Sequence, residues 1–501
     1  MVGRLVGALL AIVCVVTAQP RYRVVTYAGV GPAPDGVAAT ATFLSSPQGL
    51  AADAAGNLYV GIVNQFKVKR IDAGTSIVHT IAGNGIQANS GNGGLATKAA
   101  ILGARYVAVN SAGDVFISDL EECVVHKVDH ATQNISIYAG TGACGFSGDH
   151  GPATSAMLNG PRGITLDSYG NLYIADYGNQ RVRRVDSAAQ NITTAAGADP
   201  STHPPYGDSG QATAASLSNP RGVAIDSGGD LYIDDTGHCT IRRVSASTGV
   251  IGTYAGVPFA CGFGGDGGPA TAAQVSGNIR AITFDASDNL YLADGYSRRV
   301  RRVDRATQQI NTYAGSGAYG FSASAPALQA PFGIPEGVAV DKSTGVLYIA
   351  DWAANAIAKV VPGNPAMLSL YAGSLGPDGP ATSAFLNWPG GLASMNPDFG
   401  RWWYDGLLLT EEETGRVREI DRWGNIQTIV GVGMNAKGYS ACSVPTNCML
   451  NNPQGIVYDD FRMDYYISDT NNCVIRKLNY GSMTTIAGTG SCGYDTNAAA
   501  A

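Results

Sequence analysis

The side chains in this sequence that are best suited to chemistry are nine cysteines and six histidines. The histidines do not recur at a fixed interval, so the sequence does not encode a ring of histidine ligands. His126 and His130 are four residues apart, but they fall in a predicted strand and turn rather than on one helix face, which argues against a zinc pair. The sequence also lacks the Gly-x-Ser-x-Gly turn of serine hydrolases and a phosphate-binding glycine loop. We therefore expect no bound metal, no cofactor and no enzymatic activity.

The cysteines indicate disulfides. Cys14 lies in the apolar N-terminal segment, and the other eight are Cys123, Cys144, Cys239, Cys261, Cys442, Cys448, Cys473 and Cys492. Three pairs take the same two positions in their repeats, the start of the third strand and just past the end of the fourth. Repeats that lack the first cysteine also lack the second, and the pairs are Cys123 with Cys144, Cys239 with Cys261, and Cys473 with Cys492. Cys442 and Cys448 would close a small loop. The alternative, metal binding, has no Cys-x-x-Cys pair to support it. Disulfides require an oxidising compartment.

The elements that carry these residues come from an internal repeat. Tyr-Ala-Gly or a close variant ends at Gly29, Gly83, Gly140, Gly197, Gly256, Gly315, Gly373, Gly431 and Gly488. Successive copies are 54 to 59 residues apart. A fixed period of this length marks a chain built from one repeated supersecondary unit.

One repeat is clearest between Pro161 and Gly197. Short apolar and β-branched runs alternate with turns that contain Gly and Asn, residues that tolerate positive φ. The expected strands are 161–167, 172–176, 181–186 and 192–197. Four short strands joined by short turns form an antiparallel meander.

Eight such units follow one another, and a single four-stranded sheet cannot bury both of its faces. Arranging the sheets radially buries these faces and leaves only short edges. The sequence therefore predicts an all-β fold, a β-propeller of four-stranded antiparallel blades, with eight blades and with six or seven as the alternative. Residues 24–29 repeat the fourth strand and could complete the last blade. Alternatively, residues 484–488 close their own blade.

The stretch PRGITLDSYGNLYIADYGNQRVRRVD at residues 161–186 resembles the NHL-repeat β-propeller family. The linker SGDHGPATSAMLNGPRG at residues 147–163 is similar to the GDGGPAT-type spacers of its secreted and cell-surface members. The resemblance covers roughly residues 24–492 and is weakest in the seventh repeat, where LLLTEEE replaces LYIAD. It implies six blades and binding of protein or nucleic acid, with lyase or lactonase activity in a few related propellers. The fold alone does not choose among these functions.

The N-terminal segment predicts secretion. Residues 1–18 have a positive start, a short apolar run and a small-residue cleavage site, which is typical of a signal peptide. An uncleaved anchor is the alternative, although the run is short for a membrane span. No later stretch is apolar enough to cross a bilayer.

Two sequons agree with an extracellular location. Asn134-Ile-Ser and Asn191-Ile-Thr occupy the same turn in two repeats and predict N-glycosylation. In a bacterial protein they would be ordinary polar turn residues.

Several charged residues recur too regularly to be catalytic. The second strand ends in Asp119, Asp176, Asp235, Asp294, Asp351 and Asp469. We expect these to cap turns, since a catalytic group is normally unique. Arginine pairs such as Arg183 and Arg184 recur in the third strand, and in a chain of net charge −7 we expect them to partner acidic turns rather than nucleic acid. The linker aspartates, such as Asp149, offer too few oxygens for calcium.

The five tryptophans do not follow the repeat: Trp352, Trp388, Trp402, Trp403 and Trp423. The turns between second and third strands are expected on the same face as the long linkers, and long loops are often functional. Trp352 and Trp388 fall on that face and are candidates for anchoring a partner. Packing inside a divergent blade is the alternative.

The sequence thus predicts a signal peptide at 1–18, a propeller of eight repeats of about 57 residues at 19–492, and a tail at 493–501 where the chain could be truncated. We expect a secreted, monomeric, disulfide-braced module that binds or scaffolds a protein or glycan, without a nucleic-acid partner or a membrane span. The alternatives are a propeller lyase or lactonase with a metal in its central channel, and the ectodomain of a longer receptor.

Overall fold

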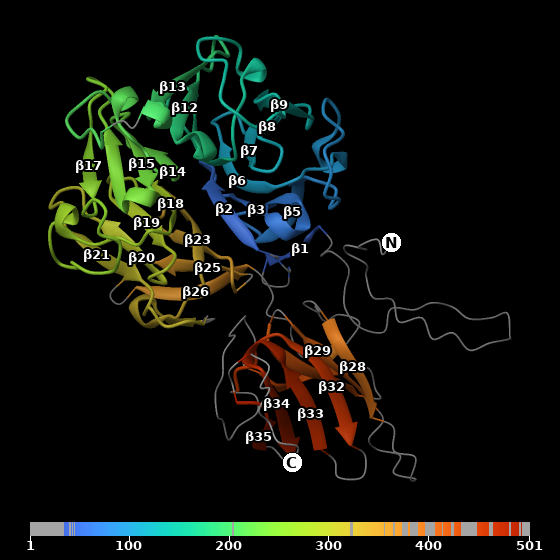
Figure 1. Ribbon diagram of the computed structural model, residues 1–501. Helices are drawn as coiled ribbons and strands as arrows, with labels where there is room; N and C mark the ends of the chain where they lie inside the picture. The colour runs from blue at the N-terminus through green and yellow to red at the C-terminus, as the bar shows by residue number, and fades with distance from the viewer. Residues whose placement is uncertain are drawn as a thin grey trace. The chain divides into compact units, whose positions relative to one another are not determined.

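A computed structural model gives the fold (Figure 1). It describes residues 35–372, except 40–41, 43, 45, 203–204, 321–323, 355 and 364–365, and then 379–380, 389–395, 406–412, 414–421, 425–431, 448–459, 464–479, 482–489 and 492. By their contacts these residues fall into two compact units, Asp35–Gly373 and a second that takes in Ser374–Ala501. No helix in the described part of the chain is long and apolar enough to cross a membrane.

The unit Asp35–Gly373 contains six antiparallel sheets, and each is a meander of four main strands in chain order. The first three sheets, which we call blades, are β2 (Pro47–Ala52), β3 (Leu58–Ile62), β4 (Lys67–Ile71) and β5 (Ile77–Ala82); β6 (Ala104–Val109), β7 (Val115–Asp119), β8 (Val124–Val128) and β9 (Ile135–Ala139); and β10 (Pro161–Leu166), β11 (Leu172–Asp176), β12 (Arg181–Val185) and β13 (Ile192–Ala196). The next three are β14 (Pro220–Ile225), β15 (Leu231–Asp235), β16 (Thr240–Val244) and β17 (Ile251–Ala255); β18 (Ile279–Phe284), β19 (Leu290–Asp294), β20 (Arg299–Val303) and β21 (Ile310–Ala314); and β23 (Pro335–Val340), β24 (Leu347–Asp351), β25 (Ala356–Val361) and β26 (Met367–Ala372).

The second unit contains the last two sheets. They are β28 (Pro389–Met395), β29 (Gly406–Glu411), β30 (Arg416–Asp421) and β31 (Asn425–Val430); and β32 (Pro453–Asp459), β33 (Asp464–Asp469), β34 (Val474–Asn479) and β35 (Ser482–Ala487). The helices among the described residues are single 3-10 turns: η2 (Val63–Gln65), η3 (Ala96–Lys98), η4 (Ala153–Ser155), η5 (Tyr177–Asn179), η6 (Pro200–Thr202), η7 (Ala212–Ala214), η8 (Thr236–His238), η9 (Ala270–Ala272), η10 (Ala327–Gln329) and η13 (Thr470–Asn472).

The six blades close into a ring. The innermost strands β2, β6, β10, β14, β18 and β23 contact one another in this order, and β23 contacts β2 (Figure 1). Leu58 and Val60 of the first blade share one buried cluster with Tyr348 and Ile357 of the sixth. The eight expected repeats are present as eight sheets. Six of these sheets form the ring of Asp35–Gly373, and a ring of six blades was the alternative to the predicted eight.

The last repeat supplies its own fourth strand. β35, which contains most of the predicted segment 484–488, pairs with β34 of the same sheet. The extra copy at residues 24–29 lies outside the described residues.

A glycine lets neighbouring innermost strands approach closely. A Cβ atom added to Gly163 would overlap the backbone of Arg221 and Gly222 in the next blade, and one added to Gly337 would overlap the carbonyl oxygen of Gln48. The glycine in the Pro-x-Gly start of β10 and β23 therefore allows this close approach.

A fully buried arginine fastens blades three to five to the linkers that precede them. In the third blade, Arg183 donates from Nη2 to Asp149 Oδ1 at 2.8 Å, and its Nη1 lies 3.4 Å from Oδ2 of Asp176. Arg242 and Arg301 are equally buried and pair with the linker residues Asp208 and Asp266, each at 2.7 Å. These contacts agree with the expectation that the arginines partner acidic groups.

The aspartate that ends the second strand caps backbone amides, as the pattern predicts. Asp176 Oδ1 accepts from the backbone N–H of Asn159 at 2.7 Å, and its Oδ2 accepts from the side chain of Asn179 at 2.8 Å. In the sixth blade Asp351 accepts from the N–H groups of Gly333 and Ile334. Burial raises the pKa of Asp351 to about 6, against the opposing effect of these bonds.

The linkers lie along the outermost strands. Isolated bridges join Leu95 to Asn134, Pro152 to Asn191, Gln211 to Val250, and Pro269 to Gln309. In the first and sixth blades the linker forms a short fifth strand, β1 (Val37–Ala38) or β22 (Ser324–Pro326). Much of each linker thus covers a sheet edge that would otherwise carry unpaired backbone groups. This differs from the expected open linker surface.

Disulfides join the three predicted cysteine pairs. The Cα atoms are 5.3 Å apart in Cys123–Cys144 and 5.2 Å apart in Cys239–Cys261 and Cys473–Cys492. Cys448 is also disulfide-bonded, and Cys442 lies outside the described residues. Three such bonds indicate folding in an oxidising compartment.

The buried arginine gives a first prediction. Replacing Arg183 with Met should lower the free energy of unfolding by about 3–5 kcal/mol, because it leaves Asp176 buried without its cation. The matched control is Arg184→Met, which breaks the half-exposed pair with Asp186 and should cost at most about 1 kcal/mol. Urea unfolding followed by fluorescence measures both, and equal losses would contradict the assigned role of Arg183.

The second prediction concerns the fourth blade. Replacing Cys239 and Cys261 together by Ser should lower the free energy of unfolding by about 3 kcal/mol, since the bond closes a loop of 22 residues. Peptide mapping without reductant should still find Cys123 linked to Cys144. An unchanged unfolding curve would mean that packing alone holds this loop.

Candidate functional site

Polar side chains from all six innermost strands meet at one end of the ring's centre. The second residue of each strand is Gln48, Arg105, Arg162, Arg221, Arg280 or Glu336, and we call these six residues the channel mouth. In every one of these strands the pairing register shifts at this point, as in a β-bulge. A bulge turns a side chain away from the regular alternation of a strand, which is how these residues reach the centre.

Tyr106 crosses the centre of the ring. It stands in the second blade where the third has Gly163, and its hydroxyl donates to the backbone oxygen of Arg280 in the fifth blade at 3.2 Å. The side chain is only 5% exposed. Burial raises the pKa of Tyr106, and the negative charge of Glu336 adds to the effect. The phenol therefore remains a protonated donor that bridges opposite blades.

The channel mouth holds four arginines and one carboxylate. Glu336 is 3% exposed and pairs with Arg280 at 2.9 Å. Burial raises the pKa of Glu336, although the surrounding arginines oppose the shift. Arg105 pairs with Glu121, in the neighbouring turn, at 2.7 Å. The mouth thus carries an excess of positive charge.

Arg162 and Arg221 have no carboxylate within ion-pair distance among the described residues, and the Nε atom of each is buried without a hydrogen-bond partner. Their guanidinium carbons lie 4.2 and 5.7 Å from the ring centre of Tyr177. Burial lowers the pKa of Arg162, and the positive charges of Arg221 and Arg105 lower it further. A bound anion would relieve this repulsion, and two neighbouring guanidinium groups suit a carboxylate or sulfate.

The remaining partners of Arg221 compensate its charge poorly. Its Nη1 donates to the neutral side chain of Asn278 at 2.9 Å. Asp234 is close enough to interact electrostatically, but burial raises the pKa of Asp234 well above its usual range. The pair of Arg162 and Arg221 is therefore the most anion-receptive part of the channel mouth.

Of the two predicted tryptophans, the structure describes Trp352. It follows Asp351 directly, as Tyr177 follows Asp176, so the two aromatic residues hold equivalent turn positions in different blades. Its backbone N–H donates to the oxygen of Ile334, two residues before Glu336, at 3.0 Å, and the residue is half-buried. Trp388 lies outside the described residues.

The two sequons lie at the starts of outermost strands. Asn191 is exposed and Asn134 is half-buried, and each precedes a strand whose edge is bridged by a linker. Each sequon lies in the turn between the third and fourth strands of its blade. The residues of the channel mouth lie on the first strands.

The arginines of the channel mouth were not predicted as a site. The available signal was Pro-Arg-Gly at 161–163 and 220–222, together with an arginine at the same place in two further repeats, Arg105 and Arg280. Only closure of the ring brings these repeated positions together.

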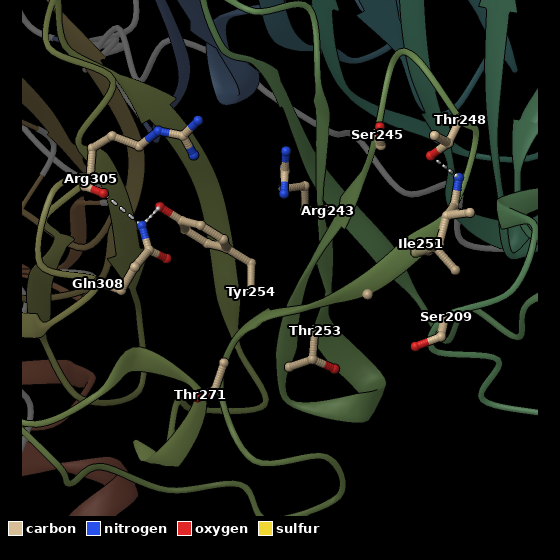
Figure 2. A pocket seen from close by; sticks show the side chains of 12 residues that line it. Ser209, Arg243, Ser245, Thr248, Ile251, Thr253, Tyr254, Thr271, Arg305 and Gln308 are labelled. Atoms are coloured by element: carbon tan, nitrogen blue, oxygen red, sulfur yellow. Dashed lines mark hydrogen bonds between the residues drawn. The ribbon is translucent and has the colours of Figure 1, made fainter.

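A second concave feature lies between the fourth and fifth blades (Figure 2). This groove of about 490 Å³ is lined by polar groups that include Ser209, Arg243, Thr253, Tyr254, Arg305 and Gln308. Gln308 donates to the backbone oxygen of Arg305 at 2.8 Å, and Arg243 pairs with Asp230. Since these groups already have partners, the groove is less suited than the channel mouth to hold a charged ligand.

The closed ring of meandering blades defines the class, a β-propeller. Residues 158–185 match the family model described as NHL repeat. Human teneurin-1 is 30% identical over 234 residues, which is 42% of this chain and 8% of that protein. Human NHL repeat-containing protein 2 is 24% identical over 263 residues, 47% of this chain and 36% of that protein. Residues 158–185 therefore match an NHL repeat, and the chain is distantly similar to these two proteins over less than half of its length.

Among solved structures, a Bacteroides thetaiotaomicron protein of unknown function has a TM-score of 0.48 at 16% identity, with 68% of this chain and 72% of that chain covered. A streptogramin B lyase has a TM-score of 0.35 at 13% identity, with 76% and 92% covered. The chain spans only a small part of teneurin-1 and about a third of NHL repeat-containing protein 2, so their activities are not transferred to it.

The site yields a third prediction. Glu336→Gln should lower the free energy of unfolding by about 3–5 kcal/mol, because Arg280 loses its buried counter-charge. Glu121→Gln, which removes the partly exposed partner of Arg105, should cost at most about 1 kcal/mol. Sulfate should restore part of the loss in Glu336→Gln, compared with chloride at equal ionic strength. Thermal unfolding measures all three, and identical behaviour of the two variants would contradict a buried role for Glu336.

Proposed function

We propose that this protein is a secreted, non-enzymatic binding module that holds an acidic segment of a partner protein or glycan at its channel mouth. The observation that carries the proposal is the pair of Arg162 and Arg221. Both are half-buried, both lie beside Tyr177, and both lack a carboxylate partner in the described part of the chain. Hydrogen bonds between a guanidinium and an anion are stronger than neutral ones.

The negative net charge of the chain restricts which anionic partners can reach the positive channel mouth. The net charge is −7, whereas the channel mouth is positive. A broad anionic surface is repelled by the rest of the protein, while a narrow acidic segment can reach the arginines. The expected partner therefore presents its carboxylates or sulfates on a projecting segment.

Rigidity favours binding of this kind. Each arginine stands on the innermost strand of a closed ring, and two disulfides brace the outer parts of the second and fourth blades. A preformed site avoids the cost of ordering flexible side chains on association. The half-buried aromatic residues Tyr177 and Trp352 would provide anchors around the charged centre.

Binding suits the chemistry of the channel mouth better than catalysis. Its groups are chiefly permanent cations, and Tyr106 is committed to its hydrogen bond with Arg280. The three disulfides support secretion, and the exposed Asn191 is suitably placed for a glycan.

The fourth prediction tests the proposal with defined ligands. Wild-type protein should bind immobilised poly-L-glutamate or hyaluronan, and Arg162→Gln with Arg221→Gln should weaken binding at least about tenfold. Each lost charge-assisted hydrogen bond is worth about 1.5–3 kcal/mol. Biolayer interferometry at two salt concentrations measures the affinities.

The matched control removes the same charge elsewhere. Arg184 and Arg302 lie on third strands and pair with Asp186 and Asp304, and changing both arginines to Gln should leave the affinity within about twofold. Equal weakening in the control would show that binding follows net charge alone. Turnover of a lactone by wild-type protein, lost with Arg162 and Arg221, would favour catalysis instead.

A further inference from the structure

The second blade departs from its neighbours at the position of the buried arginine. Blades three, four and five have Arg183, Arg242 and Arg301 there, whereas the second blade has His126. The linker residue that pairs with this arginine changes as well, because Asn92 stands where the third blade has Asp149. The arginine and its linker carboxylate have thus been replaced together.

The exchange leaves His126 among two carboxylates. Its Nε2 lies 3.1 Å from Glu122 Oε2 and 3.9 Å from Asp119 Oδ2. One ligand atom from each of the three residues lies within 4.8 Å of the others, and all three side chains are buried. The third blade has Asn179 in place of Glu122, so the second blade has gained a negative charge here while losing the cation.

This arrangement needs a positive charge. Asp119 is fully buried and Glu122 is 4% exposed, and two buried carboxylates without a cation are strongly unfavourable. A protonated His126 would supply only one positive charge against two carboxylates, whereas a divalent cation would balance both.

We propose that Asp119, Glu122 and His126 form a binding site for a divalent transition-metal ion, with zinc the best match. Imidazole nitrogen and carboxylate oxygen are both zinc ligands, and bond lengths of about 2.0–2.2 Å place tetrahedral ligands roughly 3.4 Å apart. The distances of 3.1 and 3.9 Å from Nε2 bracket this value. A dication also balances the two carboxylates.

Asp119 already has the hydrogen-bond donors that orient a ligating carboxylate. Asp119 Oδ2 accepts from the backbone N–H groups of Leu102 and Gly103, each at 3.0 Å, and its Oδ1 accepts from the N–H of Glu122 at 3.0 Å. Such bonds fix the orientation of a ligating carboxylate. The ion would join β7, β8 and the turn between them, which also carries Glu121, the partner of Arg105.

The test uses the full chain after dialysis against a chelator. Zinc titration calorimetry and elemental analysis should find one ion per chain, and bound zinc should raise the Tm. Cobalt should give the absorption bands of a tetrahedral site. His126→Gln should weaken binding at least about tenfold, since even loss of an outer-shell partner typically costs this much.

A double variant guards against simple misfolding. His126→Arg with Asn92→Asp restores the pattern of the third blade, so it should keep the Tm of the metal-free wild type or exceed it while failing to bind zinc. His130→Gln, which changes an exposed histidine of the same blade, should bind like wild type.

Two results would overturn the proposal. One is zinc binding by the double variant at wild-type affinity, which would place the ion elsewhere. The other is wild-type protein without bound metal and without a zinc-dependent Tm. A Tm that then depended on pH only when His126 is present would identify the imidazolium as the charge that balances the carboxylates.

Discussion

The outer half of blades three to five depends on one buried charge contact in each. Arg183 shows how it works, because a single guanidinium reaches both Asp176 in its own blade and Asp149 in the incoming linker. The same linker covers the edge of the outermost strand through the bridge from Pro152 to Asn191. Buried ion pairs are often no more stabilising than apolar packing, but breaking one is costly. The contact therefore acts mainly as a positional constraint that allows a single path for the linker.

The strands were predictable because their signal is local. Residues 161–167 alternate and are bounded by turn residues, and β10 is found at Pro161–Leu166. The number of blades in the ring was less accessible, because closure depends on contacts such as those between β2 and β23, nearly 300 residues apart. The linker path also escaped prediction, since it depends on which neighbouring edge needs covering.

The same distinction applies to the functional groups. Cys239 and Cys261 could be paired from sequence because presence or absence of the two cysteines varies together among the repeats. Arg162 resembles any polar residue at the start of a strand until the ring gathers six such positions. His126 was compared with His130, four residues later, whereas strand pairing places it beside Asp119 and Glu122. The short spacing between His126 and His130 was misleading, because the pairing register of β7 with β8 decides which side chains lie next to His126.

The position of the Tyr106 side chain across the ring limits the shape of a partner that can bind at the centre. Since its hydroxyl reaches the opposite blade at Arg280, the side chain spans the centre of the ring. A partner that enters from the channel mouth meets this side chain, which favours a free end or the tip of a tight bend over a chain threaded through the ring. A long, uniformly acidic polymer would then have to be gripped at its terminus, one protein molecule to each end, however many charges it carried along its length.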